Sequence, residues 1–419
     1  MSASLPRLTS PYAILALLCA AYAMSYFHRV CPAVLSVDLM NDFSLDGAAF
    51  SLISSATMLG YSLSQIPSGI LSDIIGGRRT LGIFQALAGL ACIGFTLCED
   101  ISGGLACRFL LGLVLAANIP AYKVLAVRVP PKDYARFTAI LTCSGVLGTL
   151  LASSPLVAAT SLAGWRGALM IAGCFTFVLG VSVYTLLREP ESAGQEQGGT
   201  LKENIAGLKH GCGVVLRMRQ YWLILAWFVV TVGCMFALVT MWWGGWLMQG
   251  VGLSREEAGL SMSIMALTPL PLALVVPWLS DSVFHSRRVF LLGAALLQTV
   301  CFGFIWLNDE PVSFAVLTAL GSAMPLSISA LGVMVFPMIR ETVPLSVLAT
   351  ATGVINATAP AAAAVIQVVF GAILSSETGA GASMFAAYSQ AFGFMFAISL
   401  IPVLASIIMK DTLGPKGGE

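Results

Sequence analysis

Long apolar runs separated by short polar loops follow one another along the whole chain. A helix needs about 20 apolar residues to cross the hydrocarbon core of a bilayer. Runs of that kind occur at 12–37, 48–71, 80–98, 103–127, 137–162, 166–187, 221–248, 257–279, 289–307, 312–335, 347–374 and 385–408. None of them alternates apolar and polar residues, as the strands of a transmembrane barrel would. The pattern predicts an all-α polytopic membrane protein with twelve transmembrane helices.

The chain also carries little charge. Only 10% of its 419 residues are charged, 58% are hydrophobic, and the mean hydropathy is +0.90. Soluble domains are about one quarter charged, so a disordered chain, a fibrous protein and an ordinary cytosolic enzyme are excluded. The net charge of +1 comes without a basic block, which removes the case for a nucleic-acid partner. The ten cysteines show no CxxC pair or metal-ligand spacing, and no catalytic, metal or cofactor residues are predicted.

The basic residues indicate the orientation in the membrane. Most of the 21 Lys and Arg residues fall in loops on one side if both termini are cytoplasmic, whereas Arg166 and Arg255 fall in loops on the other side. The positive-inside rule therefore predicts cytoplasmic termini in a multi-pass protein of the cell or inner membrane. We expect a monomer in the lipid bilayer.

A polar segment divides the spans into two groups of six. Residues 191–219 predict a cytoplasmic linker that includes a short surface helix. The linker separates an N-terminal half, 1–190, from a C-terminal half, 220–419.

The two halves resemble each other in sequence. A fixed shift along the chain superimposes Asp73 on Asp281, Arg79 on Arg287, and Gly145 on Gly353. Parallel six-span repeats are typical of transporters, which bind substrate at the interface of the repeats. The expected fold is therefore two pseudo-symmetric six-helix halves.

Three cations remain inside the predicted spans after the loops are assigned: Arg29, Arg108 and Lys123. All Asp and Glu residues fall in loops or at span ends. A cation at the middle of the bilayer costs about 2.5–3.5 kcal/mol on insertion scales, and such residues commonly mark a substrate or ion pathway. The positive interior predicts an anionic substrate.

Short motifs carry a resemblance to a known family. Between the second and third spans the chain reads Gly69, Ile70, Leu71, Ser72, Asp73, Ile74, Ile75, Gly76, Gly77, Arg78 and Arg79. This segment resembles the signature loop of the major facilitator superfamily. Residues 108–112 resemble the fourth-span motif of that superfamily, and residues 164–166 resemble its usual entry to the sixth span. Residues 61–67 resemble the corresponding segment of one branch of the superfamily, the anion:cation symporters. That branch includes transporters of sugar acids and of vesicular glutamate.

The chain departs from that branch at two positions linked to proton coupling. His28 stands before Arg29 where the branch typically has Asp, and Leu115 stands where it often has Glu. The resemblance therefore implies anion transport more strongly than it implies the usual coupling route. Residues 145–149 also lack the Gly-Pro pair of many drug/proton antiporters, which weakens an exporter function.

The end of the first span is the predicted centre of the site. Tyr22 and Tyr26 share a helical face with Arg29, whose guanidinium can bind a carboxylate or phosphate bidentately. The alternative is an arginine bonded to backbone carbonyls at a helix kink. His28 is a candidate coupling group because imidazole titrates near neutral pH; alternatively, it is a neutral hydrogen-bonding residue between helices.

Other candidates have a structural alternative each. Arg108 either contacts substrate or braces the first span, and Lys123 either extends to the inner interface or forms an inner anion station. Tyr61 and Gln65 share a face of the second span, which suits a cavity or ordinary packing.

In the second half, three residues stand out from apolar runs. Trp243 belongs either to an interfacial aromatic belt or to a flexible outer gate that contains paired glycines. Asn356 and Gln367 either bind substrate hydroxyls or hydrogen-bond between helices.

The charged residues of the inner loops are predicted to act in conformational gating, through charge pairs and helix-end contacts across the halves. They are Asp73, Arg78, Arg79, Asp281, Arg287 and Arg288. The alternative is anchoring by the positive-inside rule alone.

These features favour a secondary active transporter that imports a small organic anion, a carboxylate or phosphate ester, together with a proton or cation. A uniporter, an anion exchanger or an exporter of the same fold stays open, as does a non-transporting membrane receptor. A membrane-embedded enzyme would need a nucleophile–base pair or a metal cluster, and the predicted spans contain neither.

Overall fold

The computed structural model describes residues 10–116, 118–129, 131–187, 201–278, 283, 285–325 and 334–412. Within these ranges the regular structure is helical and contains no strand. The chain divides into two compact units, Met1–Phe43 with Ala56–Asn204, and Ser44–Ser55 with Ile205–Glu419.

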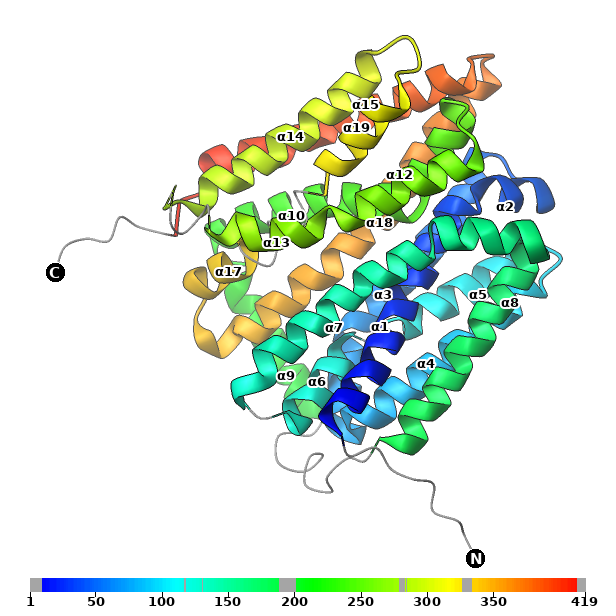
Figure 1. The fold of residues 1–419 in the computed structure, drawn as a ribbon. Helices are drawn as coiled ribbons and strands as arrows, with labels where there is room; N and C mark the ends of the chain where they lie inside the picture. Colours follow the sequence, from blue (N-terminus) through cyan, green and yellow to red (C-terminus); the bar gives the residue numbers. More distant parts are fainter. Residues whose placement is uncertain are drawn as a thin grey trace, which may run out of the picture. The chain divides into compact units, whose positions relative to one another are not determined.

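The first unit holds the helices of the N-terminal half (Figure 1). They are α1 (Pro11–Val34), α2 (Ser36–Asp42), most of α3 (Gly47–Ile75), α4 (Gly77–Thr96), α5 (Ile101–Val114), α6 (Asn118–Arg128), α7 (Pro131–Leu151) and α8 (Ser154–Leu186). Within this unit α1 packs along α7, and α4 packs along α8.

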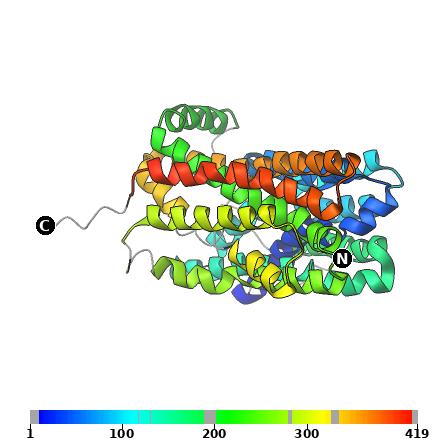
Figure 2. The same cartoon turned by 90° about the horizontal axis from the view of Figure 1, so that it is seen from above.

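The second unit contains the C-terminal half and the first turns of α3. Its other elements are most of α9 (Leu201–Val215), α10 (Arg219–Ala237), η2 (Leu238–Trp242), α11 (Trp243–Gly245), η3 (Trp246–Gly250), α12 (Arg255–Leu267), α13 (Pro269–Trp278), α14 (Arg287–Leu307), α15 (Phe314–Ala323), α17 (Phe336–Thr342), η6 (Leu345–Val347), α18 (Leu348–Gly379) and α19 (Met384–Ile408). Figure 2 shows α14 and α19 side by side. Helix α9 lies in the segment predicted as a linker.

Several predicted spans are each divided into two shorter helices. The run 137–162 was predicted as a single span, but α7 ends at Leu151 and Pro155 lies in the first turn of α8. Proline is well suited to a first helical turn, where its missing N–H has no partner to lose. The predicted span 257–279 is divided in the same way, because α13 begins at Pro269. Within α8, Gly164 is not helical and has a φ of 67°, which favours glycine, so the helix is interrupted there, between the predicted spans 137–162 and 166–187.

The outward side chains suit a bilayer. Eight stretches of helix among the described residues are long and apolar enough to cross a membrane. On α8 after Gly164, the side chains of Ile171, Phe175 and Val178 are between 51% and 68% exposed. A row of exposed apolar residues on one long helix is expected where lipid, not water, covers the surface.

Glycines allow the helices of the first unit to approach closely. A Cβ atom built on Gly148 of α7 would lie 1.9 Å from the carbonyl oxygen of Ala23 on α1. A Cβ atom on Gly112 of α5 would lie 2.2 Å from the carbonyl oxygen of Thr57 on α3. Small residues at such crossings let the backbones of membrane helices touch. The first crossing fixes the position of α1, which carries the predicted site.

Candidate functional site

Arg29 lies buried on α1 between two tyrosine rings. Its guanidinium carbon is 3.9 Å from the ring centroid of Tyr26 and 4.7 Å from that of Tyr61. Its Nε donates a hydrogen bond of 3.2 Å to the carbonyl oxygen of Ser25 on the same helix. Arg29 is 6% exposed, and among the described residues no carboxylate forms an ion pair with it. Aromatic faces stabilise a cation without neutralising it, so the site keeps a positive charge.

Two more tyrosines extend this environment. The ring of Tyr22 is centred 5.2 Å from that of Tyr26 and 6.3 Å from that of Tyr122. The hydroxyl of Tyr122 is 3.0 Å from the Thr142 hydroxyl. We call Tyr22, Tyr26, Tyr61 and Tyr122 the tyrosine row. Tyr122 was not predicted as a site residue. The one feature of the sequence that could have indicated it is its position next to Lys123 in an otherwise apolar run.

Helix α3 contributes Tyr61 and Gln65 to this region. The Tyr61 ring contacts the Arg29 guanidinium, and Gln65 lies one helical turn further along α3 on the same face. Gln65 is 3% exposed, and its Nε2 has no hydrogen-bond partner among the described residues. A buried amide donor without a partner is costly, and a ligand acceptor would satisfy it.

The side chains of His28 and Arg29 contact different helices. Its Nε2 is 2.8 Å from the hydroxyl of Thr176 on α8, whereas Arg29 contacts Tyr61 on α3. The imidazole is fully buried, and its Nδ1 has no partner in the described part of the chain. The contact with Thr176 is the one expected of a histidine that bonds between helices.

Arg108 contacts α1 in the manner of a brace. Its Nη1 donates to the carbonyl oxygen of His28 at 3.4 Å, and both terminal nitrogens lie 3.8 Å from the Cys31 sulfur. Its guanidinium carbon lies 4.2 Å from the ring centroid of Phe95. Arg108 is 1% exposed. These contacts match the bracing alternative, and Arg108 contacts Phe95 and not the tyrosine row.

Lys123 differs from the other two cations because it has an acidic partner. Its Nζ lies 2.6 Å from a carboxylate oxygen of Asp73 and donates a hydrogen bond of 2.8 Å to the carbonyl oxygen of Ser72. The sequence did not indicate this acidic partner of Lys123. Sequence spacing could not show this pair, because Asp73 is on α3 and Lys123 is on α6. The pair joins the end of α3 to α6.

The other signature-loop residues lie at helix ends of the first unit. Arg78 donates to the carbonyl oxygens of Tyr184 and Leu187 at the C-terminal end of α8. A cation is favoured there by the partial negative charge of the helix terminus. Arg79 is exposed.

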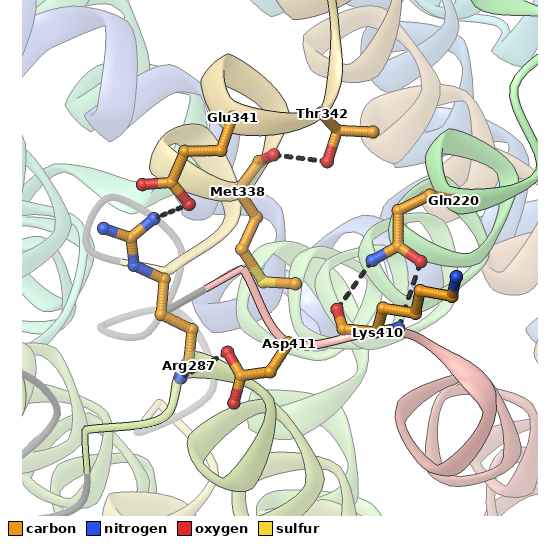
Figure 3. A network of polar contacts seen from close by, with 7 residues as sticks. All are labelled: Gln220, Arg287, Met338, Glu341, Thr342, Lys410 and Asp411. Atoms are coloured by element: carbon orange, nitrogen blue, oxygen red, sulfur yellow. Dashed lines mark hydrogen bonds and ion pairs between the residues drawn. The ribbon is translucent and has the colours of Figure 1, made fainter. Parts of the chain in front are cut away.

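Arg287 lies at the start of α14 in the second unit and contacts two acidic residues (Figure 3). Its Nη1 lies 2.5 Å from a carboxylate oxygen of Glu341, and its backbone N–H donates to Asp411 at 3.2 Å. Arg288 donates to the carbonyl oxygen of Ser406. The sequence pattern placed such pairs across the halves, but the pairs Lys123–Asp73 and Arg287–Glu341 each lie within one unit. Asp281 lies outside the described residues.

The tryptophans of the seventh predicted span are buried. Trp243 is 0% exposed, and its ring centroid lies 5.0 Å from that of Trp246. An interfacial belt would leave these rings at the surface, so that alternative does not fit. The paired glycines do not break the helix either: α11 contains both, and π-helical segments flank it. Such π-helical turns are frequent at functional sites.

Asn356 and Gln367 have different surroundings on α18. Asn356 is half-buried, one turn before Pro360 within the helix. Gln367 is fully buried, and its Nε2 donates to the hydroxyls of Ser54 at 3.0 Å and Thr240 at 2.9 Å. The amide of Gln367 therefore hydrogen-bonds between helices.

A model of the Major Facilitator Superfamily matches residues 15–244, which is more than half of the chain. The chain belongs to the Major Facilitator Superfamily. This confirms the predicted fold class, and it places the chain among membrane transporters and not among enzymes.

Individual relatives are distant. The membrane sensor protein UhpC of Escherichia coli (strain K12) is 24% identical over 307 residues, which cover 68% of each protein. The hexuronate transporter of the same strain is 25% identical over 227 residues, which cover 50% of this chain and 51% of that transporter. This chain thus matches about half the length of the hexuronate transporter.

A solved structure shows the same fold. The inward-facing, unoccupied structure of a bacterial homolog of the human lysosomal transporter Spinster has a TM-score of 0.74 with 17% sequence identity. The similarity covers 95% of both chains.

Proposed function

We propose that this superfamily member is a secondary active transporter that imports a small organic anion, a carboxylate or a phosphate ester, by alternating access. The observation that supports this most is Arg29, a buried cation between tyrosine rings with no acidic partner among the described residues. A membrane protein keeps such a costly charge where function needs it. A guanidinium also matches the planar, bidentate geometry of carboxylate and phosphate.

The groups around Arg29 suit the uncharged part of a hydroxylated anion. Tyrosine hydroxyls and the free Nε2 of Gln65 are hydrogen-bond groups on apolar walls, the composition expected of a small-molecule site. A hexuronate carries one carboxylate and several hydroxyls, and one relative is a hexuronate transporter. We therefore place Arg29 on the carboxylate, and Gln65 with the tyrosine row on the remainder.

In the second unit, Asn356 and Trp243 are proposed substrate contacts, Asn356 through substrate hydroxyls. Among the described residues, neither side chain donates hydrogen bonds to other helices as Gln367 does. Arg108 is left out of the set because its guanidinium donates a hydrogen bond to the backbone of α1. Lys123 is left out because Asp73 neutralises it.

The test compares ligands that differ by one charge. The purified full-length protein is heated with glucuronate, glucose 6-phosphate or glucose, which share a sugar ring and differ in the anionic group. A ligand that binds the folded state raises its apparent Tm by mass action. At least one anion should raise the Tm in a saturable way, whereas glucose should not. Equal stabilisation by glucose, or none by any member of a wider anion set, would contradict an anion site.

A second candidate function is a membrane sensor that binds an anion without transporting it. One relative with 68% coverage bears the name of a membrane sensor protein. Uptake of the stabilising anion into vesicles that contain the purified protein separates the two functions. Binding without uptake or exchange would favour the sensor.

His28 is the proposed coupling group, and His28→Gln should abolish the pH dependence of uptake while anion binding and exchange persist. An anion at Arg29 offsets the positive charge near the imidazole and allows it to take up a proton. Linkage then requires each ligand to promote binding of the other. The measurement is uptake against external pH, with Thr176→Val as a control that removes only the hydroxyl bonded to Nε2. Uptake that requires sodium but ignores pH would leave His28 as a packing residue.

Asp73 is proposed to act in the conformational cycle, so Asp73→Asn should slow turnover and leave equilibrium anion binding unchanged. Its pair with Lys123 is partly exposed, and such pairs contribute only about 0.2–1 kcal/mol to folding. Turnover, and the accessibility of engineered cysteines on the two faces, are measured together. If Asp73 acts through Lys123, adding Lys123→Gln should cost little more than Asp73→Asn alone. A loss of affinity with unchanged switching would contradict this role.

The proposed orientation, with cytoplasmic termini in a cell or inner membrane, is supported by the distribution of Lys and Arg alone.

A further inference from the structure

Two cysteines that are unremarkable in the sequence meet in the structure of the first unit. Cys98 follows the end of α4, and Cys107 lies in the second turn of α5. Their sulfur atoms are 3.9 Å apart, and both side chains are half-buried. The turn between them contains Glu99 and Asp100, which are exposed, so water-soluble reagents can reach it.

The surrounding contacts hold the two thiols in this position. The Cys98 thiol donates to the carbonyl oxygen of Gly94, and the Cys98 carbonyl oxygen accepts a hydrogen bond of 2.9 Å from Arg166 on α8. The Asp100 carboxylate accepts from the backbone N–H of Gly103 and so caps α5. These hydrogen bonds hold the turn in place and so keep the two sulfur atoms close together.

The geometry points to a reversible dithiol–disulfide site at Cys98 and Cys107. Two thiols in van der Waals contact need only small side-chain rotations to reach the bond length of a disulfide, about 2.05 Å. The reaction takes a disulfide oxidant, such as oxidised glutathione. One cysteine thiolate attacks the oxidant and releases one reduced glutathione, and the second displaces the other from the mixed disulfide. The products are the Cys98–Cys107 bond and two molecules of reduced glutathione, so atoms and electrons balance.

The site is placed to act on the helix that carries Arg29. Cys107 directly precedes Arg108, which donates to the carbonyl oxygen of His28 on α1. Cys98 is held by Arg166, which also forms an ion pair of 2.8 Å with Asp42 on α2. A covalent bond at this turn would fix the spacing of two groups that contact α1 and α2. If the proposed orientation is right, the turn faces the outer side, where disulfides persist.

The experiment uses the purified full chain, treated with oxidised glutathione and then with an alkylating reagent. Proteolysis after Glu99 separates Cys98 from Cys107, so the two peptides stay joined only if the disulfide has formed. We expect a joined, unalkylated pair that dithiothreitol separates, together with a higher apparent Tm of the oxidised protein that reverses on reduction. The pair should be absent in Cys98→Ser and in Cys107→Ser, and unchanged in Cys212→Ser, a half-buried cysteine on α9.

Two results would overturn the site. One is full alkylation of both thiols after oxidation. The other is a stable glutathione adduct on either cysteine of the wild-type protein, which would show that the second thiol cannot reach the first. Neither result depends on whether the protein transports an anion.

Discussion

Replacing Arg29 with Gln is expected to raise the Kd of the transported anion about 10- to 100-fold. A hydrogen bond to a charged partner is worth about 1.5–3 kcal/mol, and each 1.4 kcal/mol changes the Kd tenfold. The same change should not impair folding or membrane insertion, because it removes a buried charge that is costly in a bilayer. Binding of the purified protein, and its amount in the membrane, are measured together.

Arg108→Gln is the matched control, since it removes a second buried arginine of the same unit. Arg108 braces α1 through the carbonyl oxygen of His28 and the Cys31 sulfur, so its loss should lower thermal stability more than affinity. Normal affinity in Arg29→Gln would show that the anion binds elsewhere.

Arg29→Lys tests whether recognition is bidentate. Lysine keeps the charge but offers a compact ammonium in place of the planar fork, and it stacks less well on tyrosine faces. We expect an affinity close to that of Arg29→Gln. An affinity close to that of the wild type would instead mean that charge alone is recognised at this position.

The positions of the spans follow closely from the apolar runs. The run 12–37 corresponds to α1, Pro11–Val34, and the run 289–307 corresponds to α14, Arg287–Leu307. Run length is set by the thickness of the bilayer and therefore needs no tertiary information. Breaks were harder to predict, because a proline in an apolar run can begin a helix, as Pro155 does, or lie within one, as Pro360 does.

The contacts of the site residues could be predicted only in part. The shared face of Tyr22, Tyr26 and Arg29 follows from helical periodicity, and the structure places these side chains together. Tyr122 and the Lys123–Asp73 pair depend on how separate helices are rotated against each other. That rotation is set by packing across the helix interfaces, which a single sequence does not show. The meeting of Cys98 with Cys107 depends on the tight turn between α4 and α5 in the same way.

Gly148→Ala is expected to destabilise the protein by about 1–3 kcal/mol, the usual cost of overpacking. The added methyl group would lie 1.9 Å from the carbonyl oxygen of Ala23 and 2.9 Å from the Cβ of Tyr26. A backbone atom cannot rotate away, so α1 must move from α7. Because Ala23 and Tyr26 lie on the helix that carries Arg29, anion affinity should fall as well. Thermal unfolding and anion binding of the purified variant measure the two effects.

Gly353→Ala is the matched control from the repeat-related position of Gly145. A Cβ atom on Gly353 meets nothing within 4 Å in the described part of the chain, and alanine is the better helix former, so stability should stay equal or rise by up to about 1 kcal/mol. Gly145→Ala lies between these extremes, because the three atoms nearest to its methyl group would belong to the Tyr26 ring, the first at 2.8 Å. A ring can turn where a backbone cannot, so this variant should lose affinity more than stability. If Gly148→Ala were as stable as Gly353→Ala, the close approach of α1 and α7 would be wrong, and with it the position of Arg29 among the tyrosines.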